Sequence, residues 1–420
     1  MSSNVRSVFS RWLTSLGTIS VNAVMQAIGL LIFARKLGPS EYAVIVAATA
    51  VAALATEFVG FGAGDLLVRE VSRDPEAHRS AFGRAVRLVT ISYLPITILA
   101  SIVAVLWFRP AAVYWVVIVL VGSEIANGRI LFMTEQVAIA HHQTHRANLN
   151  RIFATAVRFA VICVAVFVAG VSTAAEWAPY SAVSAIICSG GCLAITAHRF
   201  GSPDLRSPWG SDFHIGMMFT LMQIVRAAQF SVDKFALGWI APGSTFGKFG
   251  IASRISQLGM LPATAVTRIT YPVFFAEGAK GLDAALHYAR KILSPIAAVA
   301  IVSSVGLVIV SFLVPFLLGP KFASAEHFLL ILALLPLAAG LQNLAGDVLS
   351  GSDFQAFRLI AGVIAFGLTV TAATVGGLMY GIDGALTGYM IGQFLLAASN
   401  WSMIAWLRTR RERHASQPAS

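Results

Sequence analysis

Residues 292–318 read ILSPIAAVAIVSSVGLVIVSFLVPFLL, a run of 27 residues without a charged side chain. About 20 mostly apolar residues in an α-helix cross a hydrocarbon core about 30 Å thick. A run of this length and composition predicts a transmembrane helix.

Similar runs recur along the whole chain of 420 residues. They lie near 14–34, 42–64, 88–108, 112–133, 152–170, 178–197, 215–240, 249–275, 327–350, 357–379 and 382–407. The connections are short, the longest being 65–87, and no soluble domain fits between the runs. The first run follows Arg6 and Arg11, but it is too long for a signal peptide and lacks a small-residue cleavage pattern. We therefore predict an all-α integral membrane protein with about 12 spans.

Composition agrees with this class. Hydrophobic residues make up 57% of the chain, charged residues only 12%, and the mean hydropathy is +0.77. A soluble domain carries about 25% charged residues, which is more than this chain has to cover a water-facing surface.

The basic residues predict the orientation. If the spans alternate from an inner N-terminus, 19 of the 30 Lys and Arg residues fall in inner segments, whereas the outer segments hold Arg35, Lys36, Arg109 and Lys321. This positive-inside bias places both termini in the cytoplasm. Aromatic residues are expected at the outer ends of the spans: Tyr42, Trp107, Tyr114, Trp115, Trp177, Tyr180, Trp239 and Tyr380. We interpret the net charge of +11 and the basic tail 408–420 as contacts with anionic lipid, not with nucleic acid.

The segment 199–214, RFGSPDLRSPWGSDFH, is the best candidate for a linker. It separates two predicted six-helix bundles, 1–198 and 215–407. FARKLGPSEYAVIVAATAV (33–51) and LGWIAPGSTFGKFGIASRI (237–255) occupy equivalent places in the two halves, and each has a Pro/Gly turn before a helix. The halves would then be parallel repeats, an arrangement in which transporters bind their substrate between the halves.

Ionisable residues inside the spans predict the site, because each costs at least about 2.5 kcal/mol in a bilayer. The seventh and eighth runs carry cations that we expect to bind an anionic head group: Arg226, Lys234, Arg254 and Arg268. Polar residues at helical spacing would complete the wall of a cavity: Asn22, Gln26, Gln223 and Gln257. Asp233, Glu57 and Glu124 are the candidates for ion coupling. A cationic cavity suits phosphate, which guanidinium groups bind with two donors.

Structural roles compete with these assignments. Asp233 and Arg254 can neutralise each other across neighbouring helices, and Arg129, Arg158 and Arg268 lie close enough to the cytoplasmic side to snorkel. The tract HHQTHR (141–146) lies in a predicted cytoplasmic loop without carboxylates, so we interpret it as solvated. All three cysteines fall inside spans, which leaves no disulfide framework. We expect no metal site, no cofactor and no ATPase domain.

Several motifs carry a resemblance to a known family. They are ARKLGPSEYA (34–43), FGAGDLLVRE (61–70), DKFALGWI followed by GKFGIASRI (233–255), YP (271–272) and YGIDGALTGYMIG (380–392). In this order the chain resembles the polysaccharide transporters of the multidrug/oligosaccharidyl-lipid/polysaccharide (MOP) flippase superfamily, the Wzx-type O-antigen flippases. Ala43 and Phe249 depart from that family's usual Gly and Tyr.

The resemblance implies a MATE-like fold of two six-helix bundles in the bacterial cytoplasmic membrane. It also implies that the protein flips an undecaprenyl-pyrophosphate-linked oligosaccharide by alternating access, beside glycosyltransferases and a glycan polymerase. Lipid II flippases and multidrug/cation antiporters of the same superfamily are the nearest alternatives, and the basic site disfavours organic cations. A membrane glycosyltransferase or glycan polymerase is the alternative from another class. It needs a sizeable outer loop, whereas the longest outer segment is 319–326.

Overall fold

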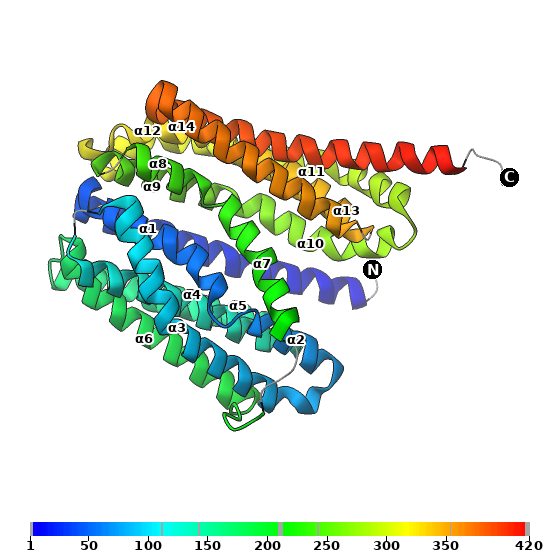
Figure 1. The fold of residues 1–420 in the computed structure, drawn as a ribbon, viewed down its shortest axis with the longest axis horizontal. Coiled ribbons are helices and arrows are strands. Elements are labelled where there is room, and N and C mark those ends of the chain that lie inside the picture. Colours follow the sequence, from blue (N-terminus) through cyan, green and yellow to red (C-terminus); the bar gives the residue numbers. More distant parts are fainter. Residues whose placement is uncertain are drawn as a thin grey trace. The chain divides into compact units, whose positions relative to one another are not determined.

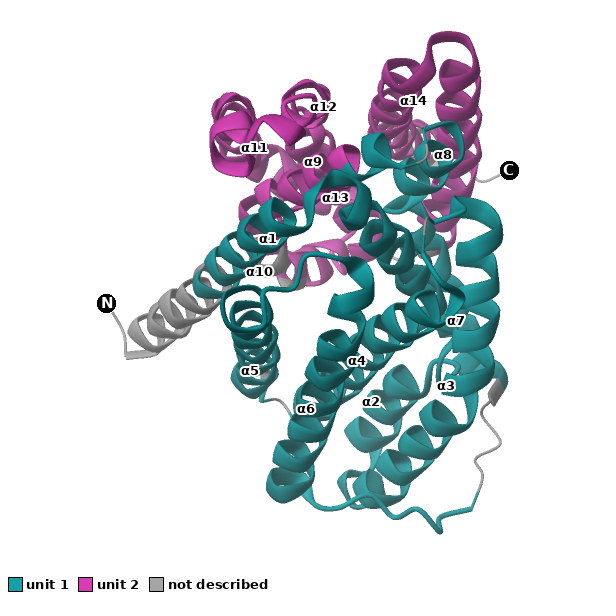
Figure 2. Cartoon of the chain, turned by 90° about the vertical axis from the view of Figure 1, so that its left-hand side faces the viewer, with its two compact units in different colours: residues 1–247 teal, residues 248–420 magenta. Residues whose placement is uncertain are grey.

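The computed structural model describes the backbone of residues 3–110, 112–141, 143–208, 213–241, 243–352 and 354–415. Within these ranges the side chains at 3–20, 144, 213, 265, 268, 269, 272, 355 and 411–415 are not described. Every regular element in the described backbone is a helix, which confirms the predicted all-α class. The chain forms two compact units, Met1–Gly247 (unit 1) and Lys248–Ser420 (unit 2), coloured separately in Figure 2.

Unit 1 contains eight α-helices and the start of a ninth in its described part. These are α1 (Ser3–Phe58), α2 (Ala63–Arg73), α3 (His78–Phe108), α4 (Tyr114–Ala140), α5 (Thr144–Cys163), α6 (Ala174–Phe200), α7 (Phe213–Gln229), α8 (Val232–Ile240) and the first turn of α9 (Ser244–Gly259). A short 3₁₀ helix, Pro75–Ala77, precedes α3, and a π-helical segment, Val164–Val168, ends α5.

Unit 2 holds the rest of α9 and the helices that follow it. These are α10 (Leu261–Gly278), α11 (Leu282–Leu318), α12 (Ala325–Leu332), α13 (Leu335–Gly351) and α14 (Gln355–Ala415). The core of this unit lies between α10, α11, α13 and α14, where Phe274, Leu282, Ile296, Leu344 and Ile404 are almost fully buried.

A glycine divides α1 into two antiparallel arms that correspond to the first two predicted spans. Gly38 has φ of +77° and ψ of 170°, a conformation that residues with a side chain rarely adopt. The next residue, Pro39, cannot donate a backbone hydrogen bond to continue the helix. Figure 1 shows the blue arm reversing direction at this point.

A glycine with positive φ also divides α14 in unit 2. Gly381, with φ of +65°, separates the arms that correspond to the last two predicted spans. Gly384, Gly388 and Gly392 then place three glycines along one face of the second arm. A Cβ atom added at Gly388 would lie only 2.2 Å from the carbonyl oxygen of Ala372 on the first arm. The two arms therefore pack backbone against backbone, as small residues allow in membranes. Figure 1 shows the orange and red arms lying side by side.

The helices account for the predicted spans. Eight stretches in the described residues are long and apolar enough to cross a membrane, and α7 with α8, bent by 52°, form a ninth. Two of the eight, Val21–Arg73 and Ala356–Arg410, contain the reversals at Gly38 and Gly381 and so provide two spans each. α9 and α10 cover the remaining predicted run, 249–275, with only Met260 between them.

The connection predicted at 65–87 is largely helical. α2 and the first turns of α3 occupy most of it, with only Asp74 and a 3₁₀ turn between them. The search for apolar runs missed α2 because it is amphipathic: Leu67 and Val71 are buried while Arg73 is exposed. α11 similarly begins at Leu282, before the predicted 292, because its charged first turns are helical as well.

The interfacial role predicted for the outer aromatic residues holds only for some of them. Trp107, Tyr114, Trp115, Trp239 and Tyr380 are exposed. Tyr42 and Trp177 are instead buried, and their rings lie 6.5 Å and 4.5 Å from that of Phe33. Where a span end packs against other helices, its aromatic residue is therefore buried inside the protein.

The segment after α6 packs on α3 within unit 1. The backbone N–H of Asp204 donates to the carbonyl oxygen of Arg79 at 2.9 Å, and the hydroxyl of Ser207 donates to that of Ser80 at 3.1 Å. Gly83 allows this approach, because a Cβ there would meet the Asp204 carbonyl oxygen at 1.8 Å. α7 and α8 follow and pack against α1, α2 and α3, so unit 1 extends past the predicted linker. The functional division at 199–214 stays a prediction.

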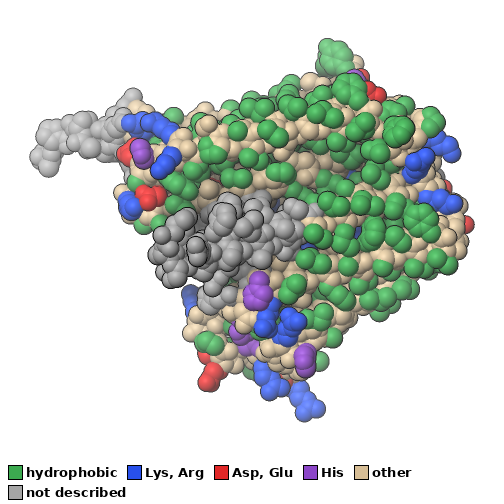
Figure 3. Space-filling view, turned by 180° about the vertical axis from the view of Figure 1, so that it is seen from behind, with side chains coloured by type: hydrophobic (Ala, Val, Ile, Leu, Met, Phe, Trp, Pro, Cys, Tyr) green, Lys and Arg blue, Asp and Glu red, His purple; other side chains and the backbone are tan. Residues whose placement is uncertain are grey.

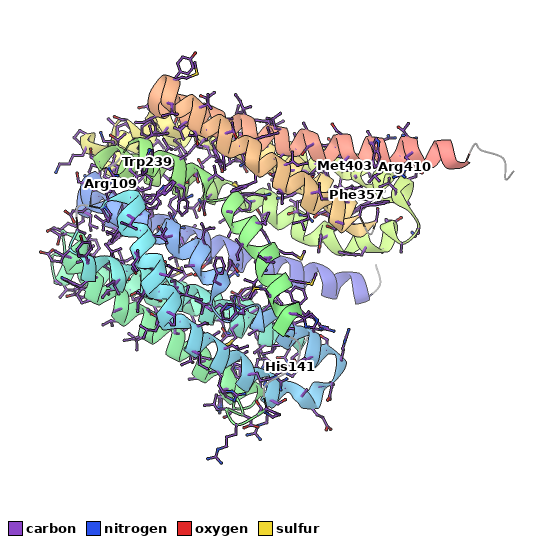
Figure 4. All side chains as sticks on the ribbon, in the orientation of Figure 1. Arg109, His141, Trp239, Phe357, Met403 and Arg410 are labelled. Carbon is purple, nitrogen blue, oxygen red and sulfur yellow. The ribbon has the colours of Figure 1, made fainter. Side chains whose placement is uncertain are left out.

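α8 packs against the predicted outer end of α3 through aromatic residues. The indole N–H of Trp107 donates to the carbonyl oxygen of Phe235 at 2.9 Å, and the Phe108 ring lies 5.3 Å from that of Phe235. The Arg109 guanidinium stacks 5.3 Å from the Trp239 ring, and Figure 4 shows these two residues together. Gly238 leaves room for Phe108. These contacts hold α8, the second half of the bent seventh span, against α3.

Candidate functional site

The predicted site residues are divided between the two units. Unit 1 carries Asn22, Gln26, Glu57, Glu124, Gln223, Arg226, Asp233 and Lys234, and unit 2 carries Arg254, Gln257 and Arg268. The side chain of Arg268 lies outside the described ones. That the four cations share one cavity therefore stays a prediction, and the geometry below is that of each unit alone.

Asp233 and Lys234 form a buried ion pair at the start of α8. The Lys234 Nζ atom lies 3.1 Å and 3.3 Å from the two Asp233 carboxylate oxygens, and it also donates to the carbonyl oxygen of Phe230 at 3.3 Å. The side chain of Lys234 is only 10% exposed and that of Asp233 only 4%. Asp233 has a structural ion-pair partner, as one interpretation of the sequence predicted. That partner is Lys234, whereas the sequence interpretation named Arg254. An anion can use Lys234 only by competing with Asp233.

Two further predicted charges are paired between α4 and α5. Arg158 donates through both terminal nitrogens to the carboxylate of Glu124. About two turns earlier on α5 and three turns later on α4, Arg151 donates to both carboxylate oxygens of Glu135, at 2.8 Å and 2.6 Å. Bidentate pairs of this kind fix the register of two helices. Arg158 thus binds Glu124, in contrast to the predicted snorkelling.

The second span is broken between α1 and α2, near its predicted cytoplasmic end. Gly60, Phe61 and Gly62 have φ values of 78°, 45° and 72°. The left-handed conformation costs a residue with a side chain about 1–2 kcal/mol, so Phe61 is held there by its surroundings. The backbone N–H of Gly60 donates to the hydroxyl of Ser92 on α3 at 2.8 Å. The break falls within the motif FGAGDLLVRE that we quoted for the family resemblance.

α7 packs directly on this break. A Cβ added at Gly62 would lie 2.2 Å from the carbonyl oxygen of Gly216, and one at Gly216 would lie 2.5 Å from that of Phe61. Only glycines permit such close approach of two backbones. Figure 1 shows α7 and α2 together at this end of unit 1.

Four ionisable side chains gather around the break, and we call them the break cluster: Glu57, Asp65, Arg129 and Arg226. Glu57 lies in the last turn of α1 and interacts electrostatically with the other three. Asp65 lies in the first turn of α2, where it accepts a hydrogen bond from Gln136 Nε2 at 3.4 Å. None of the four forms an ion pair with another described side chain.

The two arginines of the break cluster differ in exposure. Arg129 on α4 is 3% exposed, and its Nε and Nη2 atoms have no hydrogen-bond partner among the described residues. Its guanidinium lies 5.3 Å from the Phe132 ring. A Cβ at Gly60 would come within 3.3 Å of those same two nitrogens. Arg129 is therefore held in place and does not snorkel. Arg226 on α7 is exposed, and its side chain forms no hydrogen bond or ion pair with a described residue.

The residues of the predicted polar faces differ in exposure. Asn22 is 9% exposed and its Oδ1 atom lacks a partner among the described residues, whereas Gln26, one turn later, is exposed. Gln223 is half-buried. In unit 2, Arg254 is exposed and Gln257 donates to the Ser253 hydroxyl at 3.5 Å.

Two carboxylates at membrane depth were not predicted from the sequence. Asp65 is half-buried, and it lies in a glycine-rich motif beside the helix break. Asp347 on α13 is 5% exposed and interacts electrostatically with Arg358 on α14, which donates to the Ser350 hydroxyl at 2.7 Å. A lone Asp in the apolar run 327–350 was the available signal.

One histidine of the tract is packed, which corrects its interpretation as solvated, whereas His145 is exposed. His141 ends α4, its Nε2 lies 3.1 Å from His78 Nδ1, and its ring stacks 4.9 Å from that of Phe200. Figure 4 labels His141 at this end of unit 1. His142 lies outside the described residues. No group of three metal-ligating side chains occurs in the described part of the chain.

Comparison with known proteins relates this geometry to a fold. The chain resembles an inward-facing multidrug resistance MATE family transporter of the MOP superfamily, with a TM-score of 0.76 and 16% identity over 94% of this chain and 96% of that one. It resembles the lipid II flippase MurJ in an inward closed conformation, with a TM-score of 0.74 and 13% identity over 94% of this chain and 87% of that one. At such identities the likeness shows the fold, and the predicted MATE-like MOP fold is confirmed.

An outward-facing MATE transporter of the same superfamily gives a TM-score of 0.63 and 16% identity over 97% of this chain and 96% of that one. No curated protein matches the sequence. A family model described as "Polysaccharide biosynthesis protein" matches residues 9–276, which is more than half of the chain and includes the break cluster. This multi-pass membrane protein therefore belongs to the polysaccharide biosynthesis protein family.

Proposed function

We propose that this protein is a flippase that carries an undecaprenyl-pyrophosphate-linked oligosaccharide across the bacterial cytoplasmic membrane by alternating access. Both termini lie in the cytoplasm, and glycosyltransferases and a glycan polymerase act before and after it. The membership in the polysaccharide biosynthesis family and the MOP fold support this class of function.

The single observation that carries the substrate class is the cationic side of the break cluster. Arg129 presents buried nitrogens without partners among the described residues, and Arg226 is exposed; both arginines lie in electrostatic range of Glu57. Guanidinium groups bind phosphate oxygens in pairs, so these two residues suit a pyrophosphate. The cluster lies toward the predicted cytoplasmic ends of the second and fourth spans, on the side where lipid-linked repeat units are assembled.

The remaining predicted residues take part in the same proposal. Arg254 and Arg268 provide further cations on the eighth span, while Lys234 contributes only in a state in which Asp233 releases it. The sugar occupies the polar cavity and the polyprenyl chain stays in lipid. With the cytoplasm negative, moving negative charge outward is favoured by about 2.3 kcal/mol per charge per 100 mV.

A liposome assay tests the assignment of Arg226. Purified protein is reconstituted with a fluorescent polyprenyl-pyrophosphate-linked oligosaccharide, and arrival in the outer leaflet is read by lectin accessibility. We expect Arg226→Ala to slow flipping at least about tenfold, the effect of losing one charged contact. Arg206→Ala is the matched control, because Arg206 is an exposed arginine of the linker. A fully active Arg226→Ala protein that reconstitutes normally would contradict the assignment.

Two experiments distinguish the proposed function from the lipid II alternative. One is gene deletion, and the other is competition between lipid II and the lipid-linked oligosaccharide in the same liposomes. Loss of a lipid II flippase is lethal, whereas loss of a surface-glycan flippase changes the coat and spares growth. An enzyme alternative predicts turnover of a sugar nucleotide by the purified protein. Either a lethal deletion rescued by this chain alone or sugar transfer in detergent would overturn the proposal.

A further inference from the structure

Glu57 occupies an unusual position for a carboxylate in a protein that handles anions. It is half-buried in the last turn of α1, and it interacts electrostatically with Arg129 of α4 and with Arg226 of α7. Asp65, across the break, repels it. Unlike Glu124, Glu135 and Asp233, it has no ion-pair partner among the described side chains.

This position differs from that of a structural salt bridge. Glu124 and Glu135 each accept two hydrogen bonds from an arginine, Arg158 and Arg151 respectively. Glu57 and Arg129 lie in electrostatic range, yet the Nε and Nη2 atoms of Arg129 donate to neither carboxylate of the cluster. A buried guanidinium without direct partners is costly, so a conformation or ligand that supplies acceptors is favoured.

A carboxylate and a phosphate compete for the same donors. Both present oxygens in the geometry that a guanidinium fork binds, and both are repelled by a second negative charge within a few ångströms. Glu57 therefore stabilises the arginines while no anion is bound and weakens the binding of any anion that arrives. A site with this arrangement releases its ligand more readily than a purely cationic one.

The backbone next to Glu57 can accommodate such an exchange. The residue is followed by Phe58 and then by the left-handed segment Gly60–Gly62, which links α1 to α2 and bears the contact with Gly216 of α7.

We infer that Glu57 is an internal counter-anion of the head-group site: it neutralises Arg226 and Arg129 when the site is empty and is displaced by the phosphate groups of the substrate. Glu57 thereby sets the affinity for the anion and permits its release. This inference rests on the proposed function and adds a residue that determines affinity, not ion coupling.

Binding of inorganic pyrophosphate to the full-length protein in nanodiscs tests the inference. We expect Glu57→Gln to bind pyrophosphate about five- to tenfold more tightly, because one like charge is removed while size is kept. Glu57→Asp keeps the charge and is expected to bind close to the wild-type affinity. In the liposome assay, Glu57→Gln should lower KM for the lipid-linked substrate and also lower kcat, because release becomes slower.

A double-variant comparison separates this role from a structural one. The gain from Glu57→Gln should disappear in the Arg226→Gln background, since the two residues act on one anion. Glu76→Gln, an exposed glutamate of the 74–77 turn, is the matched control and should leave affinity unchanged. Unchanged or weaker pyrophosphate binding by a Glu57→Gln protein with wild-type thermal stability overturns the inference, as does an equal gain from Glu76→Gln.

The two proposals can fail separately. If no lipid-linked oligosaccharide is flipped but Glu57→Gln still tightens pyrophosphate binding through Arg226, the counter-anion role of Glu57 is supported and the substrate assignment is contradicted. If flipping is observed while Glu57→Gln changes neither affinity nor kcat, the flippase stands and the role of Glu57 falls.

Discussion

At the scale of single residues, some membrane-depth charges of the described chain form ion pairs and others do not. Asp233 with Lys234 and Glu124 with Arg158 are neutralised by direct contact. Arg129 and Glu57 interact only over a longer range. The pairs stabilise one conformation, whereas the unpaired charges are available to a ligand.

The pair on α8 gives a prediction about stability. Lys234→Ala leaves the Asp233 carboxylate buried without its ammonium, and breaking a buried pair in this way costs about 3–5 kcal/mol. The double variant Asp233→Ala/Lys234→Ala removes both charges and should recover a large part of that loss. Thermal unfolding in detergent measures both. A double variant that is less stable than Lys234→Ala would show that the pair is not the source of the effect.

At the scale of the elements, glycines decide where helices break and how closely they pack. Gly38 and Gly381 turn a helix back on itself, and Gly243, also with φ of +77°, opens the turn before α9. Gly38 and Gly243 lie in the two stretches that we aligned as a repeat. Gly62 and Gly216 allow α7 to rest on the break in the second span.

The glycine face of α14 supplies a matched test. Gly388→Ala places a methyl group 2.2 Å from the Ala372 carbonyl oxygen, so the arms must separate at a cost of about 1–3 kcal/mol. Gly367→Ala on the same helix meets nothing within 4 Å and should be neutral or slightly stabilising. Thermal unfolding of unit 2 in the full-length protein compares the two. Equal stability of both variants would contradict backbone-to-backbone packing of the arms.

At the scale of the whole molecule, the charge pattern describes a protein immersed in lipid. Apolar side chains cover most of the face seen in Figure 3, and Lys and Arg residues gather toward its ends. The tail after the last span continues as helix, with Arg410 5.4 Å from the Trp406 ring and Arg408 paired with Asp283 at 3.4 Å. These contacts suit the predicted anchor at the lipid head groups.

Cysteine labelling tests the predicted orientation. The native cysteines lie within the helices, and Cys188 and Cys192 are buried, so a membrane-impermeant maleimide should react poorly with the wild-type protein. Lys321→Cys should label in intact spheroplasts, because it lies in a predicted outer segment. Arg206→Cys should label only after the membrane is opened. The reverse pattern would place the termini outside.

The sequence by itself determined the helical class, the positions of the spans and the family, because run length, charge bias and turn glycines are local properties. It also pointed to Arg226 and Glu57, since a charge in an apolar run is visible without a structure. Only the tertiary structure decided which charges are neutralised. Lys234 binds its own neighbour and Arg158 binds Glu124, while Arg129, Asp65 and Arg226 interact with Glu57 from three other helices. Such partnerships depend on distances between helices, which spacing along the chain does not encode.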